Sequence, residues 1–258
     1  YFDGKTIFPE DFYRIQAQGT DIKTYHINQY MFRENFEPYA KAGDEVLYMC
    51  FSTGIAGTFN AANLAKEELL EEYPEFDLTI IDTKCASLGF GLAVEKILRM
   101  QANGAPKDLI IEAAQFFCEH MEHIVTVETL EYLYKGGRLS KTSAVLGGVL
   151  DLKPIIEVND DGALVAIEKV RGRHKSLKRC VELVGERGVE LDKQVIGVVH
   201  GNDPETCEKV SAMLMEKYHC RGIIKSWVGC AIGAHTGPGI IGIVFLSASE
   251  EKYAEYLK

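Results

Sequence analysis

Residues 45–101 decide the fold, and they read EVLYMCFSTGIAGTFNAANLAKEELLEEYPEFDLTIIDTKCASLGFGLAVEKILRMQ. Two short apolar runs, Glu45–Ser52 and Asp77–Asp82, have the length and composition of β-strands. Each run is followed by a stretch with helical features. The first covers Thr58–Glu72 and ends before Pro74, and the second covers Leu88–Gln101. Strands that alternate with helices of this length are typical of βαβ units around a parallel sheet.

The alternation continues towards the C-terminus. Pro106 suits the first turn of a helix that runs to about Met121. The run His123–Val127 then predicts a third strand of the parallel sheet. After a turn at Lys135–Arg138 the pattern changes from alternation to adjacent β-like runs.

The second half of the chain begins with a predicted hairpin. Asn159–Gly162 is a strong hairpin signal between the runs Pro154–Val158 and Ala163–Val170. We therefore predict an α/β fold with two domains: a parallel α/β/α N-terminal domain over residues 1–125 and a mixed-sheet α/β C-terminal domain over residues 126–258. Further strands are predicted at Val195–His200, Gly222–Val228 and Gly239–Leu246, and further helices at Lys175–Arg187, Glu205–Tyr218 and Glu250–Leu257.

The composition excludes several classes of protein. Lys and Arg number 28 and Asp and Glu number 38, so the net charge of −10 argues against broad nucleic-acid binding. No apolar run approaches the roughly 18 residues that span a bilayer, so we expect no integral membrane segment. The seven cysteines include no C-x-x-C pair. They indicate reduced, buried thiols in a cytoplasmic protein rather than a zinc or redox site.

Three loops at predicted strand ends carry groups that suit an anion, since free N–H groups and a helix dipole favour negative charge there. They are Ser52–Thr58, Asp82–Gly91 and His235–Gly239. The alternative for each is an ordinary turn. The second loop contains G-x-G, but Val94 stands where a dinucleotide fingerprint has its third glycine. The remaining histidines show no metal-ligand spacing, and no nucleophile–base pair is evident.

A basic cluster contrasts with the acidic remainder of the chain. It is either a solvated face or a contact surface for an acidic partner or a phosphate. Its members are Lys169, Arg171, Arg173, His174, Lys175, Lys178 and Arg179.

A series of short motifs, in order along nearly the whole chain, resembles the DegV family of bacterial lipid-binding proteins. The motifs are Thr24 in DIKTYHIN, Ser52–Thr58, Ile81–Thr83 with Ser87, Gly89 and Gly91, Val127–Leu133 with Lys135–Arg138, Leu152–Ile155 before Asp161–Gly162, Lys169 with Arg171, His200–Gly201, and His235–Gly239.

The resemblance implies a fatty acid held in a cleft between two α/β domains, with no catalysis, metal or cofactor of the protein's own. It also implies that the acyl chain is presented to a separate fatty-acid kinase related to dihydroxyacetone kinases. The residues expected at the carboxylate end are Thr24, Ala56, Gly57, Thr58, His235 and Thr236. Those expected to support the cleft are Ser52, Asp82, Ser87 and Arg138, and those expected to dock the partner are Lys169, Arg171, Arg173 and Lys175.

Two departures bear on the head-group end. The family usually has Thr-Ser where this chain has Thr24–Tyr25, and Ser-Gly-Thr where it has Ala56–Gly57–Thr58. Losing one hydroxyl donor to a charged partner costs on the order of 1–3 kcal/mol, so we expect retained ligand binding with an altered preference. The alternative is an enzyme or binder that acts on a small anionic ligand, a carboxylate or phosphate, at the same cleft through His235 or Asp82.

The start of the chain also departs from the family. The resemblance places an additional first strand and an Asp-Ser loop before the stretch YFDGKTIFPEDFY, which begins at Tyr1. A strand missing from the first sheet should leave apolar surface beside it. We expect either a longer natural chain or another segment that fills the gap.

Overall fold

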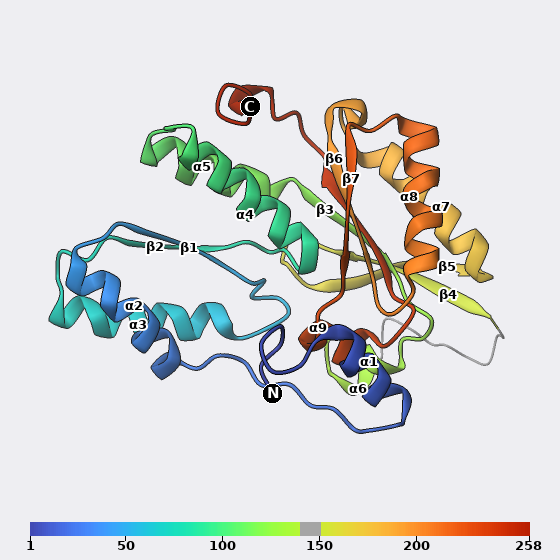
Figure 1. Cartoon of the computed structure of the whole chain (residues 1–258), viewed down its shortest axis with the longest axis horizontal. Helices are drawn as coiled ribbons and strands as arrows, with labels where there is room; N and C mark the ends of the chain where they lie inside the picture. Colours follow the sequence, from blue (N-terminus) through green and yellow to red (C-terminus); the bar gives the residue numbers. More distant parts are fainter. Residues whose placement is uncertain (140–150) are drawn as a thin grey trace.

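The computed structural model describes residues 1–139 and 151–258, and it builds them around two β-sheets (Figure 1). The smaller sheet pairs β1 (Val46–Cys50) with β2 (Leu78–Asp82) in parallel, in the register Val46↔Leu78 to Cys50↔Asp82. The larger sheet has the strand order β5-β4-β3-β8-β6-β7 and mixes antiparallel with parallel pairs. The predicted α/β class with one parallel and one mixed sheet is confirmed.

Helices cover both faces of the small sheet. On one face lie α2 (Gln29–Ala42) and α3 (Thr58–Glu72), whose aromatic and alanine side chains pack on Leu78. On the other face lie α4 (Ser87–Ala102) and α5 (Lys107–Glu119), which pack on Met49 and Ile81. The prediction for α3 is confirmed to the residue, because Thr58 follows the turn glycine and Pro74 cannot continue the helix.

The large sheet is covered on one face by α7 (Arg173–Arg187) and α8 (Pro204–Tyr218). Figure 1 shows both helices on the same side of the strands. The strands alternate their side chains between faces, so every second residue points to these helices. Ile124, Ile243 and Phe245 belong to that core. The strands are β3 (Met121–Thr126), β4 (Leu152–Val158), β5 (Leu164–Arg171), β6 (Val195–His200), β7 (Gly222–Trp227) and β8 (Ile241–Leu246).

The third predicted strand exists, but its predicted partner is wrong. β3 does not extend the parallel sheet; it lies antiparallel between β4 and β8 in the large sheet. Strand–helix alternation along a chain does not specify which sheet a strand joins. One hydrophobic core includes Met49 and Phe117 from before the predicted domain boundary and Val244 from after it. The division into residues 1–125 and 126–258 therefore stays a prediction.

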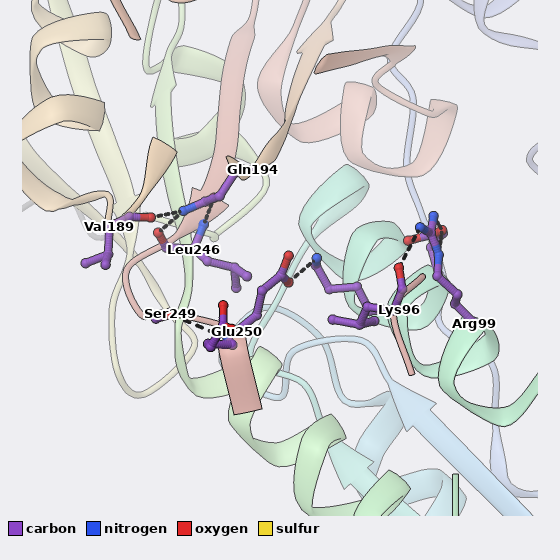
Figure 2. A network of polar contacts seen from close by, with 10 residues as sticks. Lys96, Arg99, Val189, Gln194, Leu246, Ser249 and Glu250 are labelled. Atoms are coloured by element: carbon purple, nitrogen blue, oxygen red, sulfur yellow. Dashed lines mark hydrogen bonds and ion pairs between the residues drawn. The ribbon is translucent and has the colours of Figure 1, made fainter. Parts of the chain in front are cut away.

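The C-terminal segment crosses from β8 back onto α4 and α5. The predicted helix over Glu250–Leu257 is wrong, because only the short 3-10 turn η3 (Glu251–Tyr253) forms. Two side chains of the α4 region donate hydrogen bonds to backbone carbonyls of this segment. Arg99 donates to the Leu257 oxygen at 3.2 Å, and Asn103 donates to the Tyr256 oxygen at 2.9 Å. Lys96 pairs with Glu250, and Figure 2 shows this contact beside Gln194, which holds the end of β8. The tail therefore fastens α4 to the large sheet.

Within residues 1–139 and 151–258, four helices were not predicted: α1 (Pro9–Ala17), α2, α6 (Glu131–Lys135) and α9 (Cys230–Thr236). In α1, Phe12 and Tyr13 are buried and pack on Cys230 of α9. Figure 1 places α1, α6 and α9 together below the large sheet. A further short helix in the described part of the chain is the 3-10 helix η2 (Leu191–Lys193).

A groove of about 530 Å³ is lined by residues of β1, β2, α4 and α5. Leu47 and Met49 of β1 face Phe90, Val94 and Ile97 of α4 across it. Among the residues that the structure describes, no helix has the length and apolar character needed to cross a membrane.

Candidate functional site

A second cavity, of about 410 Å³, lies on the face of the large sheet opposite α7 and α8. Its floor follows from strand alternation, because the residues between those of the α7–α8 core point to this face. Val125 of β3 and Val244 of β8 lie there, and Gly242 of β8 pairs with Val125. The other strand residues of the floor are His123, Ile156, Val158, Leu164 and Val199.

The cavity is roofed by three loops that follow or precede other elements. The β1–α3 loop contributes Phe51, Ile55 and Ala56, and the start of α4 contributes Ala86 and Ser87. A third segment, Thr24–Ile27, crosses the opening between α1 and α2. We call it the strap. All four strap residues line the cavity and are nevertheless exposed to solvent, so the strap forms the mouth of the cavity.

The mouth is pinned by a hydrogen bond between distant parts of the chain. The Thr24 hydroxyl lies 2.7 Å from Nε2 of His235 in α9. Burial and the nearby Arg138 guanidinium lower the pKa of His235, which favours its neutral form. Within the described residues Nδ1 of His235 is buried without a hydrogen-bond partner. The prediction of a loop over His235–Gly239 is wrong at its start, because His235 and Thr236 are the last residues of α9 and the loop begins at Gly237.

Arg138 brings a positive charge to the same place. Its guanidinium donates to the Gly136 oxygen at 2.6 Å and to the Ile55 oxygen at 3.3 Å, and the side chain lines the cavity. The second bond ties the segment after α6 to the β1–α3 loop. A fixed arginine beside an apolar cavity favours an anionic group at this end.

Two helices also point their N-termini at the cavity. The first N–H groups of a helix have no partner inside it. In α3 and α4 no side chain caps them either. Thr58 and Ser87, the first residues of these helices, both line the cavity. Ser87 takes a positive φ of 50°, a strained conformation for a residue with a side chain. Both helix dipoles add positive potential where the hydroxyls lie.

The structure brings most of the predicted carboxylate-end residues together, and their ligand role stays a prediction. Gly57 is the N-cap of α3, immediately behind the cavity wall. Thr236 lines the cavity, but its hydroxyl donates to the Ile232 oxygen within α9 at 3.2 Å. The other residues of the set that line the cavity are Thr24, Ala56, Thr58 and His235.

Two of the predicted cleft-supporting residues act on the loops around the cavity. The buried Ser52 hydroxyl donates to the Gly162 oxygen at 2.6 Å, which joins the β1–α3 loop to the β4–β5 hairpin. The Asp82 carboxylate accepts from the N–H groups of Thr53 and Lys84 at 3.1 and 3.2 Å. Both residues shape the loops from behind, whereas Ser87 and Arg138 face the cavity.

The glycine pattern after β2 has a packing explanation. A Cβ at Gly89 would lie 2.2 Å from Nε2 of His123, so only glycine fits there. That imidazole is fully engaged: Nε2 accepts from Ala86 N–H at 3.2 Å, and Nδ1 bonds the Met121 oxygen at 3.0 Å. Sequence reasoning missed His123 as a cavity residue. Strand alternation places it on the floor face, but only knowledge of the correct sheet makes that alternation informative.

The predicted docking residues lie away from the cavity lining. Lys169 and Arg171 are exposed at alternate positions of the edge strand β5, and Lys175 is exposed in the first turn of α7. Arg173 is half-buried, with its Nε 3.0 Å from the Glu128 carboxylate and a further bond to the Gly239 oxygen. Arg173 therefore fastens the loop after α9. Among the described residues, no cluster of three metal-binding side chains occurs.

Together these features define a two-sheet α/β protein with an apolar cavity whose mouth carries polar groups and the Arg138 guanidinium. A family model described as "Uncharacterised protein, DegV family" matches residues 1–248, so the chain belongs to the DegV family. A DegV domain-containing protein of Clostridium perfringens is 37% identical over 243 residues, which are 94% of this chain and 84% of the relative.

Solved structures agree with this assignment. DegV of Bacillus subtilis, described as a fatty acid binding protein, has a TM-score of 0.81 at 28% identity and covers 95% of this chain and 86% of its own. A fatty acid binding DegV family protein of Streptococcus agalactiae has a TM-score of 0.81 at 26% identity, with the same coverage. A Ruminococcus gnavus DegV family protein described with vaccenic acid has a TM-score of 0.85 at 22% identity, covering 95% and 86%.

Proposed function

We propose that this protein binds a long-chain fatty acid in the 410 Å³ cavity, with the carboxylate at the mouth. The observation that carries the proposal is that one cavity has an apolar end and a polar end. Aliphatic side chains of the large sheet form the first, and Thr24, His235, Arg138 and the N-termini of two helices form the second. Each methylene that leaves water contributes about 0.8 kcal/mol. The apolar walls therefore reward a long chain, and the polar end fixes its direction. The descriptions of the related structures support the same ligand class.

Native mass spectrometry of protein expressed in bacteria, followed by titration with palmitate and oleate, tests this proposal. We expect a co-purified acid or an affinity that rises with chain length. Val125→Phe places a ring on the cavity floor and should weaken binding by about tenfold or more, since it displaces at least two methylenes. The partly exposed Val189 lies outside the cavity, so Val189→Phe is the control. A cavity with no affinity for any long-chain acid would refute the proposal.

A second candidate is an enzyme acting on a small anion, because the Thr24 hydroxyl and the His235 imidazole lie within hydrogen-bonding distance. A catalytic histidine needs a group that orients its second nitrogen. In the described part of the chain Nδ1 of His235 has no such partner. We therefore favour a binding protein without catalysis. Turnover of a short carboxylate or phosphate that His235→Ala abolishes would reverse this choice.

We further propose that the bound acid is presented to a separate fatty-acid kinase through the exposed cations of the β5–α7 surface, Lys169, Arg171 and Lys175. The support is their exposure and their position outside the cavity lining, which leaves lipid affinity independent of docking. Lys169→Glu with Arg171→Glu should lower the rate of acyl phosphate formation at unchanged lipid affinity. Lys209→Glu with Lys217→Glu, at two exposed positions of α8, is the charge-matched control. An unchanged rate would remove this surface from docking.

We propose a cytoplasmic location on the state of the cysteines. All seven are free and buried: Cys50, Cys85, Cys118, Cys180, Cys207, Cys220 and Cys230. Buried free thiols suit a reducing compartment. Fractionation of the native host followed by detection with an antibody tests the location, and recovery outside the cytoplasmic fraction would contradict it.

A further inference from the structure

His26 differs from the other two histidines that the described residues place on the cavity. His123 has both ring nitrogens bonded to backbone, and His235 has Nε2 bonded to Thr24. His26 lies in the strap and is exposed, yet it lines the same cavity. An imidazole that is open to solvent on one side and to the cavity on the other can exchange water for a ligand atom.

The position of the His26 ring relative to α3 is specific. A Cβ at Gly57 would lie 3.8 Å from Nε2 of His26 and 3.9 Å from its Cε1. The ring edge that carries Nε2 therefore faces the N-cap of α3. The first N–H groups of that helix have no acceptor inside it and no side-chain cap. The Thr58 hydroxyl lines the cavity at the same helix end.

Ala56 leaves one position at this helix end without a hydroxyl donor. Ala56 lines the cavity two residues before Thr58, and its methyl group offers no hydrogen bond. A carboxylate accepts up to about four hydrogen bonds, and an unsatisfied charged oxygen costs more than a neutral one. An imidazole Nε2–H that reaches over Gly57 supplies a donor on the strap side of the head group.

We propose that His26 is a specificity-determining residue that donates to the carboxylate of the bound acid and so selects acids over lipids with neutral head groups. This inference rests on the proposed function, because it assigns one contact within the same cavity. The carboxylate would lie between the His26 ring on the strap and the Thr58 end of α3. The acyl chain would extend from there over Val125 and Gly242.

The experiment compares oleate with oleyl alcohol, which share a chain and differ in the head group. Calorimetric or fluorescence titrations of wild type, His26→Ala and His26→Gln give the ratio of the two affinities. We expect His26→Ala to weaken oleate about tenfold and oleyl alcohol less than twofold, since only oleate offers His26 a charged acceptor. His26→Gln keeps a donor and should recover part of the loss. His174→Ala, an exposed histidine on α7, is the matched control.

The outcomes separate the inference from the proposed function. Wild type that binds oleate together with His26→Ala that binds it equally well would overturn the role of His26 and leave fatty-acid binding intact. An equal loss for oleate and oleyl alcohol would also overturn it, because His26 would then act only as part of the wall. Wild type that binds neither ligand would refute the proposed function, and the inference with it.

Discussion

The Thr24 hydroxyl and Nε2 of His235 lie 2.7 Å apart, although 211 positions separate them in the sequence. This bond joins the strap to α9, whose own position depends on Phe12 and Tyr13 of α1 packing on Cys230. The mouth of the cavity is therefore assembled from the two ends of the described chain. Its geometry depends on tertiary packing rather than on any local motif.

Thr24→Val should detach the strap from His235 while keeping the volume of the side chain at position 24. The substitution removes the hydrogen bond to His235 and one hydroxyl at the carboxylate end, so we expect oleate affinity to fall about tenfold, equivalent to about 1.4 kcal/mol. Isothermal titration calorimetry measures the change. Thr20→Val, at an exposed position just before the strap, should leave affinity unchanged. A Thr24→Val protein with wild-type affinity would show that the bond plays no part in binding.

Acid should destabilise the protein partly through His123. Burial lowers the pKa of this imidazole from 6.5 to about 4. Between pH 6.5 and about 4, the unfolded chain therefore protonates this imidazole while the native state keeps it neutral. The free energy of unfolding then falls as pH drops through this window, by at most about 1.4 kcal/mol per pH unit and about 3 kcal/mol in total.

Urea denaturation of wild type and His123→Gln between pH 7 and 4 isolates this contribution. Glutamine can accept the Ala86 N–H bond but cannot titrate, so the pH dependence of its unfolding free energy should be shallower. His200 and His235, whose pKa values burial also lowers, act equally in both proteins. Parallel curves for the two proteins would show that His123 does not resist protonation.

The sequence predicted local elements better than their partners. α3 and β6 match to the residue, because Gly57, Pro74 and the short Val195–His200 run mark their ends locally. The third strand was assigned to the wrong sheet, since alternation with helices does not encode antiparallel pairing with β8. In place of the predicted closing helix the chain forms only η3, and Arg99 and Asn103 hold the following tail through its backbone carbonyls, contacts that no local pattern encodes.

The site shows the same division. Loops at strand ends directed attention to Thr58, Ser87 and His235, which all line the cavity. The family motifs led to Thr24. No local sequence pattern indicates that His26 and His123 line the cavity. The position of His26 depends on how the strap crosses the mouth, and that of His123 depends on which face of the large sheet its side chain points to.

Gly54→Ala should separate the β1–α3 loop from the β4–β5 hairpin. A Cβ at Gly54 would lie 2.4 Å from the Gly162 carbonyl carbon and 2.6 Å from the Ala163 nitrogen, and backbone atoms cannot rotate away. We expect a loss of about 1–3 kcal/mol in the free energy of unfolding, together with weaker oleate binding. Gly91→Ala in α4, whose Cβ would meet Leu88 Cδ1 at an ordinary 3.6 Å, should be neutral or stabilising. Equal urea midpoints for Gly54→Ala and wild type would contradict the predicted clash.

Gln194→Ala should loosen the connection at the end of β8 that Figure 2 shows. The buried amide donates to the Val189 and Leu246 oxygens at 2.6 and 2.8 Å and accepts from the Leu246 N–H at 2.8 Å. Truncation leaves the Val189 oxygen and the Leu246 N–H unpaired, whereas the Leu246 oxygen still accepts from the Val189 N–H at 3.3 Å, so we expect a loss of about 3 kcal/mol. Gln194→Glu should not rescue stability, because it sets a carboxylate oxygen against two carbonyls. Gln101→Ala, at an exposed position of α4, is the control for losing a glutamine. Urea denaturation measures all three variants, and a rescue by glutamate would show that the donor bonds do not hold this strand end.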